Sequence, residues 1–136
     1  MKNNSAHPTL FLLFNHRLTG AQEADAYITF GVSIIIPPPP AITRLWAEIP
    51  PDAEAVAPTL APIRDWLVAE STPGDFILIQ GDFGASFVMV NAAFRLGLIP
   101  VYATTIRQAV EQHLPDGTVK ISHIFSHVRF RRYEQG

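Results

Sequence analysis

The sequence contains no cysteine, so disulfide bonds and thiolate metal sites are excluded. It also lacks an apolar run of the roughly 18 to 20 residues that a membrane-spanning helix needs. The apolar run at residues 9–14 has neither the length nor the cleavage site of a signal peptide. We therefore expect a soluble, cytoplasmic protein with no membrane partner, and the absence of cysteine is compatible with a reducing compartment.

A strong charge of one sign is absent as well. The formal net charge is −2, which argues against a protein that binds duplex DNA by neutralising many phosphates. The charge is uneven, because the segment from residue 104 onward holds five basic and three acidic residues together with three of the five histidines. An acidic chain can therefore still carry a local anion-binding site near its C-terminal end.

The composition that remains is typical of a single compact domain. The chain has 136 residues, of which 48% are hydrophobic and 16% charged, and this is enough apolar material for a core. We expect one domain spanning residues 1–136, without internal repeats.

Short apolar runs alternate with helical patterns along the chain. The runs predict buried strands at residues 9–14, 32–36, 76–79 and 98–103. Helical patterns lie at residues 19–28, 42–49, 58–71 and 85–96. After a turn at residues 115–117, the segment 118–133 alternates and predicts one or two antiparallel edge strands. This order indicates an α/β, Rossmann-like fold: a mostly parallel sheet with helices on both faces and an antiparallel C-terminal edge.

Several residues mark where these elements begin and end. Thr19 and Gln22 have the spacing of a capping box at a helix start. Four prolines at residues 37–40 must end the preceding strand and favour polyproline II, most simply as a stiff connector. Gly97 stops the helix at residues 85–96.

Polar residues follow three of the predicted parallel strands. Asn15, His16 and Arg17 follow the first strand, the glycine-containing turn at residues 80–84 follows the third, and Thr104 and Thr105 follow the fourth. The carboxyl ends of parallel strands share one edge of the sheet, where ligands of open α/β sheets bind. We expect the binding site at this edge.

The turn at residues 80–84 suits an anion. Gly81 and Gly84 allow backbone N–H groups to approach a ligand, and the helix that follows offers its positive N-terminus. The turn is neither a dinucleotide fingerprint nor a Walker loop. Asp82 would repel a phosphate, so it is better placed to cap the helix. Ser86 either donates to a phosphate or simply occupies the first helical turn.

The terminal segment adds positive charge. His127, Arg129 and Arg131 alternate with apolar residues, so a regular strand would place all three on one face. The alternative is a solvated outer face on an edge strand. We expect no metal site, because the histidines are scattered and His123 with His127 would lack an acidic third ligand.

The helix at residues 85–96 is apolar almost all round, broken mainly by Asn91 and Arg95. Such a helix is either enclosed in the core or packed against a second subunit. For a chain of this size we expect a homodimer with two-fold symmetry.

Three blocks of sequence, TLFLLFNHRLT at residues 9–19, FILIQGDFGASFVMVNAAFRLGLIPVYATT at 76–105 and HVRFRRYE at 127–134, carry a resemblance to a known family. Together they resemble the small CRISPR-associated Csx-type proteins of type III systems that act as ring nucleases. The resemblance implies a CARF-like domain, a homodimer, and a cyclic oligoadenylate ligand, most favourably cyclic tetra-adenylate, lying across the two-fold axis. It also implies cleavage of this second messenger, which switches off antiviral signalling.

On this hypothesis, Arg17 stabilises the charge that develops on phosphate, because its planar fork matches phosphate oxygens. His16 is the candidate acid or base, since imidazole exchanges protons near neutral pH; otherwise it merely ends the strand. Phe83 or Tyr102 could stack on a base. We expect the reaction to need no metal or cofactor. The candidate ligand-binding residues are Asn15, Gln80, Gly81, Asp82, Phe83, Gly84, Ser86, Thr104, Thr105, Arg107, His127 and Arg129.

Two other functions use the same sequence features. A sponge or sensor would bind cyclic oligoadenylate without cutting it, because positioning and catalysis draw on the same residues. A nucleotide-binding regulatory subunit would use the apolar helix at residues 85–96 as a heteromeric interface.

Overall fold

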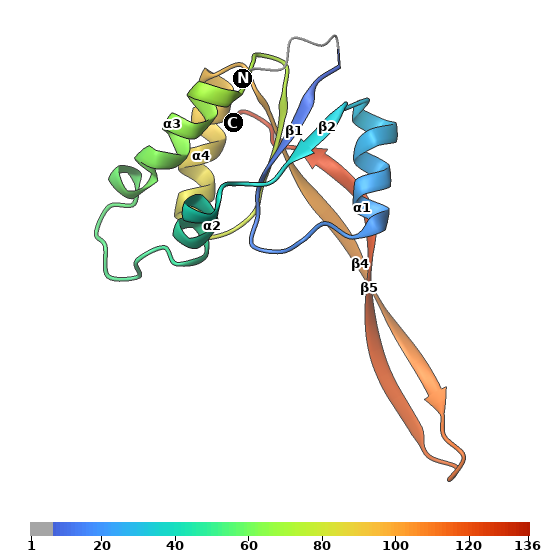
Figure 1. Ribbon diagram of the computed structural model, residues 1–136. Helices are drawn as coiled ribbons and strands as arrows, with labels where there is room; N and C mark the ends of the chain where they lie inside the picture. Colours follow the sequence, from blue (N-terminus) through green and yellow to red (C-terminus); the bar gives the residue numbers. More distant parts are fainter. Residues whose placement is uncertain (1–6) are drawn as a thin grey trace.

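The computed structural model describes residues 7–136, which form one five-stranded sheet with helices on both faces (Figure 1). The spatial order of the strands is β2-β1-β3-β4-β5. The strands are β1 (Thr9–Leu13), β2 (Ile34–Ile36), β3 (Phe76–Ile79), β4 (Ile99–His113) and β5 (Val119–Arg132). All neighbouring strands are parallel except β4 and β5, which are antiparallel. The expected mostly parallel α/β sheet with an antiparallel C-terminal strand is confirmed.

The helices divide between the two faces of the sheet. They are α1 (Gly20–Asp25) with the π-helical η1 (Ala26–Phe30), α2 (Pro40–Ala47), the 3-10 helix η2 (Ala57–Leu60), α3 (Ala61–Glu70) and α4 (Phe83–Arg95). In Figure 1, α1 covers one face, whereas α2, α3 and α4 cover the other. The predicted helix at residues 58–71 begins as η2 and continues as α3, and the helix expected after Thr19 ends in a π-helical turn.

Each face of the sheet has its own apolar core. One core lies between the sheet and the helices α2, α3 and α4. It contains Phe11 and Leu13 of β1, Ile77 and Ile79 of β3, and Trp46 of α2. The alternate residues of β1 and β3 face α1 and η1. Since both faces are covered, the central strands are apolar without alternation, which is why β1 and β3 are recognisable from sequence.

The predicted start of the first helix and the predicted stop after α4 are confirmed, whereas α4 begins at Phe83, two residues before its predicted start. Thr19 Oγ1 accepts a hydrogen bond from the Gln22 N–H at 3.2 Å, and Gln22 Oε1 accepts from the Thr19 N–H at 2.9 Å. Gly97 follows α4 with φ +75, a left-handed conformation that favours glycine. The four prolines connect β2 to α2, with Pro40 as the first residue of that helix.

The prediction that a strand ends at residue 103 is wrong. β4 continues to His113, and Thr104, Thr105 and Arg107 lie inside it. Only its first residues pair with β3, as far as Val101, whereas the remainder pairs with β5 alone. The segment at residues 105–128, called the arm below, is thus a two-stranded ribbon that leaves the body of the molecule (Figure 1).

The prediction that His127, Arg129 and Arg131 share one face is also wrong. Thr104 lies opposite Arg129 and Thr105 opposite His127, so Val128 is an extra residue with no partner in the ladder. This β-bulge interrupts the alternation. The His127 ring therefore lies beside the Phe130 ring, with centroids 4.9 Å apart, on the face covered by α1.

Gly81 should be required by the close approach of Trp46. A Cβ at residue 81 would lie 2.6 Å from Trp46 Nε1 and 2.7 Å from Cε2, and the Trp46 side chain is held in the core. We expect Gly81→Ala to lower the free energy of unfolding by about 1 to 3 kcal/mol, because the indole must shift. Urea unfolding followed by Trp fluorescence measures this change.

Gly84→Ala is the matched control. Its added Cβ would meet Asp82 Oδ2 at 3.6 Å and Val56 Cγ1 at 3.8 Å, which are ordinary contacts. We expect the free energy of unfolding to stay the same or to rise by up to about 1 kcal/mol. Equal losses in the two variants would contradict the packing argument.

Candidate functional site

The candidate site lies where the order of the sheet reverses. β1 and β3 are neighbours in the sheet, but the chain leaves them toward opposite faces. It runs from β1 to α1 on one face and from β3 to α4 on the other. Loops diverge at such a point and leave room for a ligand at the carboxyl edge. Asn15, His16 and Arg17 follow β1 here, and Gln80 and Gly81 follow β3.

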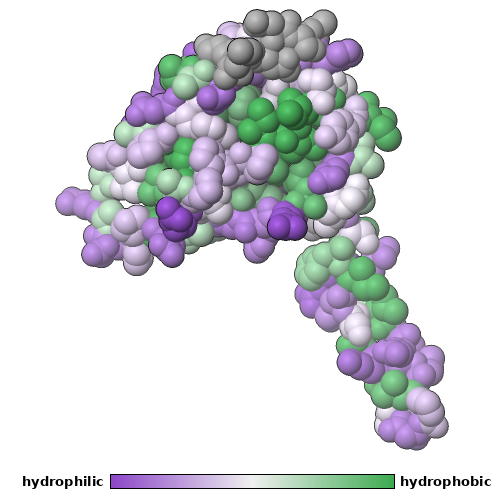
Figure 2. Space-filling view, in the orientation of Figure 1, coloured by the Kyte–Doolittle hydropathy of each residue, from purple (hydrophilic) through white to green (hydrophobic). Residues whose placement is uncertain are grey.

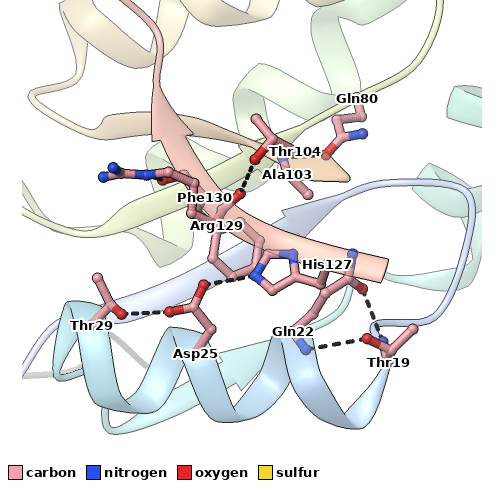
Figure 3. Close-up of polar contacts among 10 residues, drawn as sticks. All are labelled: Thr19, Gln22, Asp25, Thr29, Gln80, Ala103, Thr104, His127, Arg129 and Phe130. Carbon is pink, nitrogen blue, oxygen red and sulfur yellow. Dashed lines mark hydrogen bonds and ion pairs between the residues drawn. The ribbon is translucent and has the colours of Figure 1, made fainter. Parts of the chain in front are cut away.

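Gln80 joins the elements that meet at this edge. Its backbone N–H donates to the Leu13 carbonyl at 3.1 Å, and its side-chain Oε1 accepts from the Ala103 N–H at 2.7 Å (Figure 3). Its carbonyl accepts from Trp46 Nε1 at 2.9 Å. The ends of β1 and β3 and the middle of β4 are thereby fixed relative to each other and to α2. Gln80 was expected to bind the ligand. In the structure, its backbone carbonyl and its side-chain oxygen both accept hydrogen bonds that hold these elements together.

One pocket at the edge holds the first loop. It has a volume of about 550 Å³ and lies between the loop after β1, the first helix and the prolines after β2. His16 and Arg17 line it together with Glu23 and Tyr27. Within residues 7–136, neither His16 nor Arg17 forms a hydrogen bond or ion pair, and both are exposed. Their polar groups are therefore available to a ligand.

A second pocket of about 750 Å³ lies along α4. Gln80, Phe83, Ser86, Tyr102 and Tyr133 are among the residues that line it. The Phe83 side chain is not part of the core, because the residue is 96% exposed. Ser86 Oγ is buried and has no hydrogen-bond partner in the described part of the chain. This pocket thus combines an exposed aromatic ring with an unsatisfied hydroxyl.

Asp82 caps α4, as the sequence predicted. Its Oδ2 accepts from the Ala85 N–H at 2.9 Å. The carboxylate therefore already occupies the N-terminus of this helix, which weakens that terminus as an anion site. Gly84 is in the first turn of α4 and meets no close neighbour.

A tyrosine pair that the sequence reasoning did not connect forms one wall of the second pocket. The rings of Tyr102 and Tyr133 have centroids 4.7 Å apart. The Tyr133 hydroxyl donates to the Ile79 carbonyl at 2.7 Å, and Arg131 donates to the Tyr102 hydroxyl at 3.2 Å. Burial, together with the neighbouring Tyr102, raises the pKa of Tyr133. The alternation of HVRFRRYE was the only sequence signal that Arg131 and Tyr133 belong to a strand and its continuation, and nothing in it pointed to Tyr102 on β4.

The residues expected from β4 and β5 lie along the arm and its root, not in a loop. Thr104 Oγ1 donates to the Arg129 carbonyl at 3.0 Å. The Arg107 guanidinium lies 5.9 Å from the centre of the Phe125 ring. Arg107 is thus several residues beyond the edge that holds His16 and Gln80. The structure does not bring these groups into one pocket within a single chain.

His127 fastens the root of the arm to the first helix. Its Nε2 lies 2.7 Å from Asp25 Oδ2, and Thr29 donates to the other oxygen of that carboxylate (Figure 3). The His127 side chain is only 6% exposed, which leaves little surface for a ligand. Burial alone would raise the pKa of Asp25, but the Thr29 hydroxyl and the His127 ring hold it below the ordinary value of 3.8.

Because its pKa is lowered in the folded state, Asp25 should contribute stability above about pH 4, and this contribution should disappear as the pH falls through the lowered pKa. We expect Asp25→Asn to lower the melting temperature by about 3 °C at neutral pH. The difference in melting temperature between the variant and the unsubstituted protein should shrink once the pH falls below 3.8, the ordinary pKa of an aspartate. Thermal unfolding across a pH series measures it.

Glu23→Gln is the control for this experiment, since Glu23 is an exposed carboxylate on the same helix. We expect its melting temperature to follow the unsubstituted protein at every pH. A loss in Asp25→Asn that does not diminish in acid would argue against the charged form of Asp25 as the source of the stability.

Within residues 7–136, no group of three or more His, Asp or Glu side chains is placed to hold a metal ion. No helix in that range is long and apolar enough to cross a bilayer.

Comparisons with known proteins identify the family. The model of the "Uncharacterized protein MJ1673 family" matches residues 8–131. The protein MJ1673 of Methanocaldococcus jannaschii is 43% identical over 126 residues, which cover 93% of this chain and 97% of that relative. No solved structure matches the chain. On the extent of both matches, the chain belongs to the MJ1673 family.

Proposed function

We propose that the protein is a cytoplasmic ring nuclease that binds cyclic oligoadenylate, with cyclic tetra-adenylate as the favoured ring. It would cut the ring to linear products with 2′,3′-cyclic phosphate ends and so end type III CRISPR signalling. The observation that carries the proposal is that His16 and Arg17 stand exposed and unpaired at the point where the strand order reverses. The sequence blocks that resemble ring nucleases contain this loop and the strand ends beside it.

The reaction needs no metal. The ribose 2′-oxygen attacks the adjacent phosphorus, a 2′-oxygen–phosphorus bond forms, and the bond from phosphorus to the 5′-oxygen breaks. The 2′-hydroxyl gives up its proton to a base and the leaving 5′-oxygen gains one. Arg17 would donate to the non-bridging oxygens, whose negative charge grows in the transition state. His16, adjacent in sequence, would accept or donate one of the two protons.

The two pockets suit different parts of the ligand. The pocket around Arg17 offers cationic and imidazole groups to a phosphate, whereas the pocket along α4 offers the exposed Phe83 ring to a base and Ser86 to a ribose or phosphate. A ring that spans a two-fold axis would meet one such set from each chain of a dimer. This arrangement matches the alternation of bases and phosphates in a cyclic oligonucleotide.

The alternative to a nuclease is a sponge, which binds the ring without cutting it. The small number of acid–base groups near Arg17 favours this alternative. Asp82 is engaged in capping α4, so the acid–base groups in the pocket around Arg17 are His16, Glu23 and Tyr27. A protein with this edge could retain the ring without cutting it. Both versions bind the same ligand, and only the fate of the ligand separates them.

Turnover in EDTA tests the proposal. We expect the protein to convert a large molar excess of cyclic tetra-adenylate to linear di-adenylate with a cyclic-phosphate end, seen by chromatography and mass. Arg17→Ala should lower kcat by about 100-fold to 1,000-fold, because a charge-stabilising donor is lost. Its Kd should change far less than its kcat.

Arg95→Ala is the control, since Arg95 is an exposed arginine at the far end of α4. Its kcat should equal that of the unsubstituted protein. An intact ring retained at fixed stoichiometry would make the protein a sponge, and the absence of binding would end the cyclic oligoadenylate proposal.

The role of His16 is tested by His16→Asn, which keeps a polar side chain of similar width. If imidazole transfers a proton, kcat should fall by about 100-fold and its pH dependence near neutrality should flatten. Single-turnover rates between acidic and basic pH measure both effects. An unchanged pH profile would remove His16 from the mechanism.

A further inference from the structure

Apart from the contact of His127 with Asp25 at its root, the arm at residues 105–128 has no packing partner in the described part of the chain. Beyond Ala103, β4 pairs only with β5, and Figure 1 shows this ribbon extending away from the sheet and the helices. It leaves the body beside the edge at which β1 and β3 end, because β4 runs parallel to β3 and continues past it. A two-stranded ribbon alone in water is only marginally stable. The arm is therefore built to lie against something.

Its apolar side chains support that conclusion. Seven large apolar residues of the arm are between 39% and 67% exposed: Ile106, Val110, Val119, Ile121, Ile124, Phe125 and Val128. Figure 2 shows hydrophobic residues scattered among polar ones along the projecting ribbon. Residues opposite one another in the ladder share a face, so Phe125 lies with Arg107 on one face, whereas Ile124 lies with Gln108 on the other. Neither face is purely polar.

The charges of the arm point to a protein partner. Arg107 and Lys120 are balanced by Glu111 and Asp116. A ribbon without net charge of one sign gains little from the phosphates of nucleic acid or from an anionic membrane surface. The attraction must come from the apolar side chains, which suit an apolar protein surface.

This chain carries such a surface at the same edge. α4 begins where β3 ends, and its first turns expose Phe83 to 96% and Phe87 to 70%. A second copy facing this edge across a two-fold axis could cover both its own arm and these two rings with one repeated contact. Nine residues of β4 beyond the bulge give the arm a reach of about 30 Å. A compact chain of this length has a radius of gyration of about 14 Å, so the arm can span it.

The apolar area is also sufficient. On the face that holds Phe125, Ile121 and Val119, the exposed fractions amount to about 300 Å² on one arm, at roughly 150 to 200 Å² for each fully exposed large apolar residue. Two arms, with an equal area covered on the two α4 surfaces, give about 1,200 Å², which is the lower end of the range for a specific interface between proteins.

We propose that the arm embraces a second copy of this chain, with its apolar side chains packed on the α4 surface around Phe83 and Phe87 of that copy. The embrace is reciprocal and brings the two carboxyl edges together. Phe83 and Phe87 also line the second pocket, so the arm of one copy would form part of the wall of that pocket in the other. The embrace does not depend on the identity of the ligand, because the apolar side chains that carry it are exposed in the single chain without one. Failure to bind cyclic oligoadenylate would leave it intact.

Sedimentation of the full chain over a range of concentrations tests the embrace. The unsubstituted protein should have twice the 15.0 kDa mass of the chain. The double variant Ile121→Glu, Phe125→Glu should raise the dimer dissociation constant by at least about 100-fold, because it would bury unpaired charges. Circular dichroism and thermal melting should show that the variant body stays folded, since these side chains pack on no part of it.

Val68→Glu is the matched control, since Val68 is an apolar residue of α3 that is 55% exposed. It should leave the mass at twice that of the chain. A monomeric unsubstituted protein would overturn the proposal, and so would a dimer that withstands the double variant.

Photo-crosslinking locates the contact. Benzoylphenylalanine in place of Phe125, in a mixture of ¹⁴N- and ¹⁵N-labelled chains, should join the arm of one copy to residues 83–90 of a differently labelled copy. Crosslinks confined to one copy, or found only between the two arms, would overturn the docking on α4.

Discussion

The hydrogen bonds of Gln80 hold the carboxyl edge of the sheet together. One residue donates to β1 through its backbone N–H, accepts from β4 through its side chain and accepts from Trp46 through its carbonyl. All three bonds lie at the point where the loops after β1 and β3 part. Partial burial strengthens such bonds and makes each one costly to lose. The position of every residue at this edge depends on them.

The hydrogen bonds of Gln80 separate the residues of this edge into two groups with different roles. In the loop after β3, Gln80 bonds β1, β4 and α2, Gly81 leaves room for the Trp46 ring, and Asp82 caps α4. His16 and Arg17 follow β1 and have no such task. A rigid support beneath the unpaired guanidinium and imidazole groups favours ligand binding, because only these side chains remain to be ordered when the ligand binds.

The central fold could be predicted from sequence, since its signals are local. The apolar runs of β1 and β3 are covered on both faces, and the capping box at Thr19 and the glycine at residue 97 are fixed by neighbouring backbone groups. The residues of the candidate site that follow β1 and β3 could be placed at the carboxyl edge for the same reason. The contact between Tyr102 and Tyr133 could not be predicted, because these residues are 31 positions apart in the sequence and are brought together only by the pairing of β4 with β5.

The arm and its bulge could not be predicted, because neither follows from a local pattern. Residues 104–113 mix charged, polar and apolar side chains without the alternation of a half-buried strand. Only pairing with β5 extends β4 so far. The extra residue Val128 reverses the face of His127 relative to Arg129, and a sequence pattern contains no sign of it. The contact between His127 and Asp25 is what the bulge makes possible.

Assembly and chemistry would be coupled through the position of the arm. It leaves the body beside the edge that carries His16 and Arg17, so a second copy held by the arm would lie over that edge. Covering the edge would displace water from the loop after β1. The attraction between the Arg17 guanidinium and a phosphate strengthens when water is excluded, because the effective dielectric constant falls. The exposed ribbon, which is unfavourable for one chain in water, would then strengthen the charge interactions on which the proposed cleavage depends.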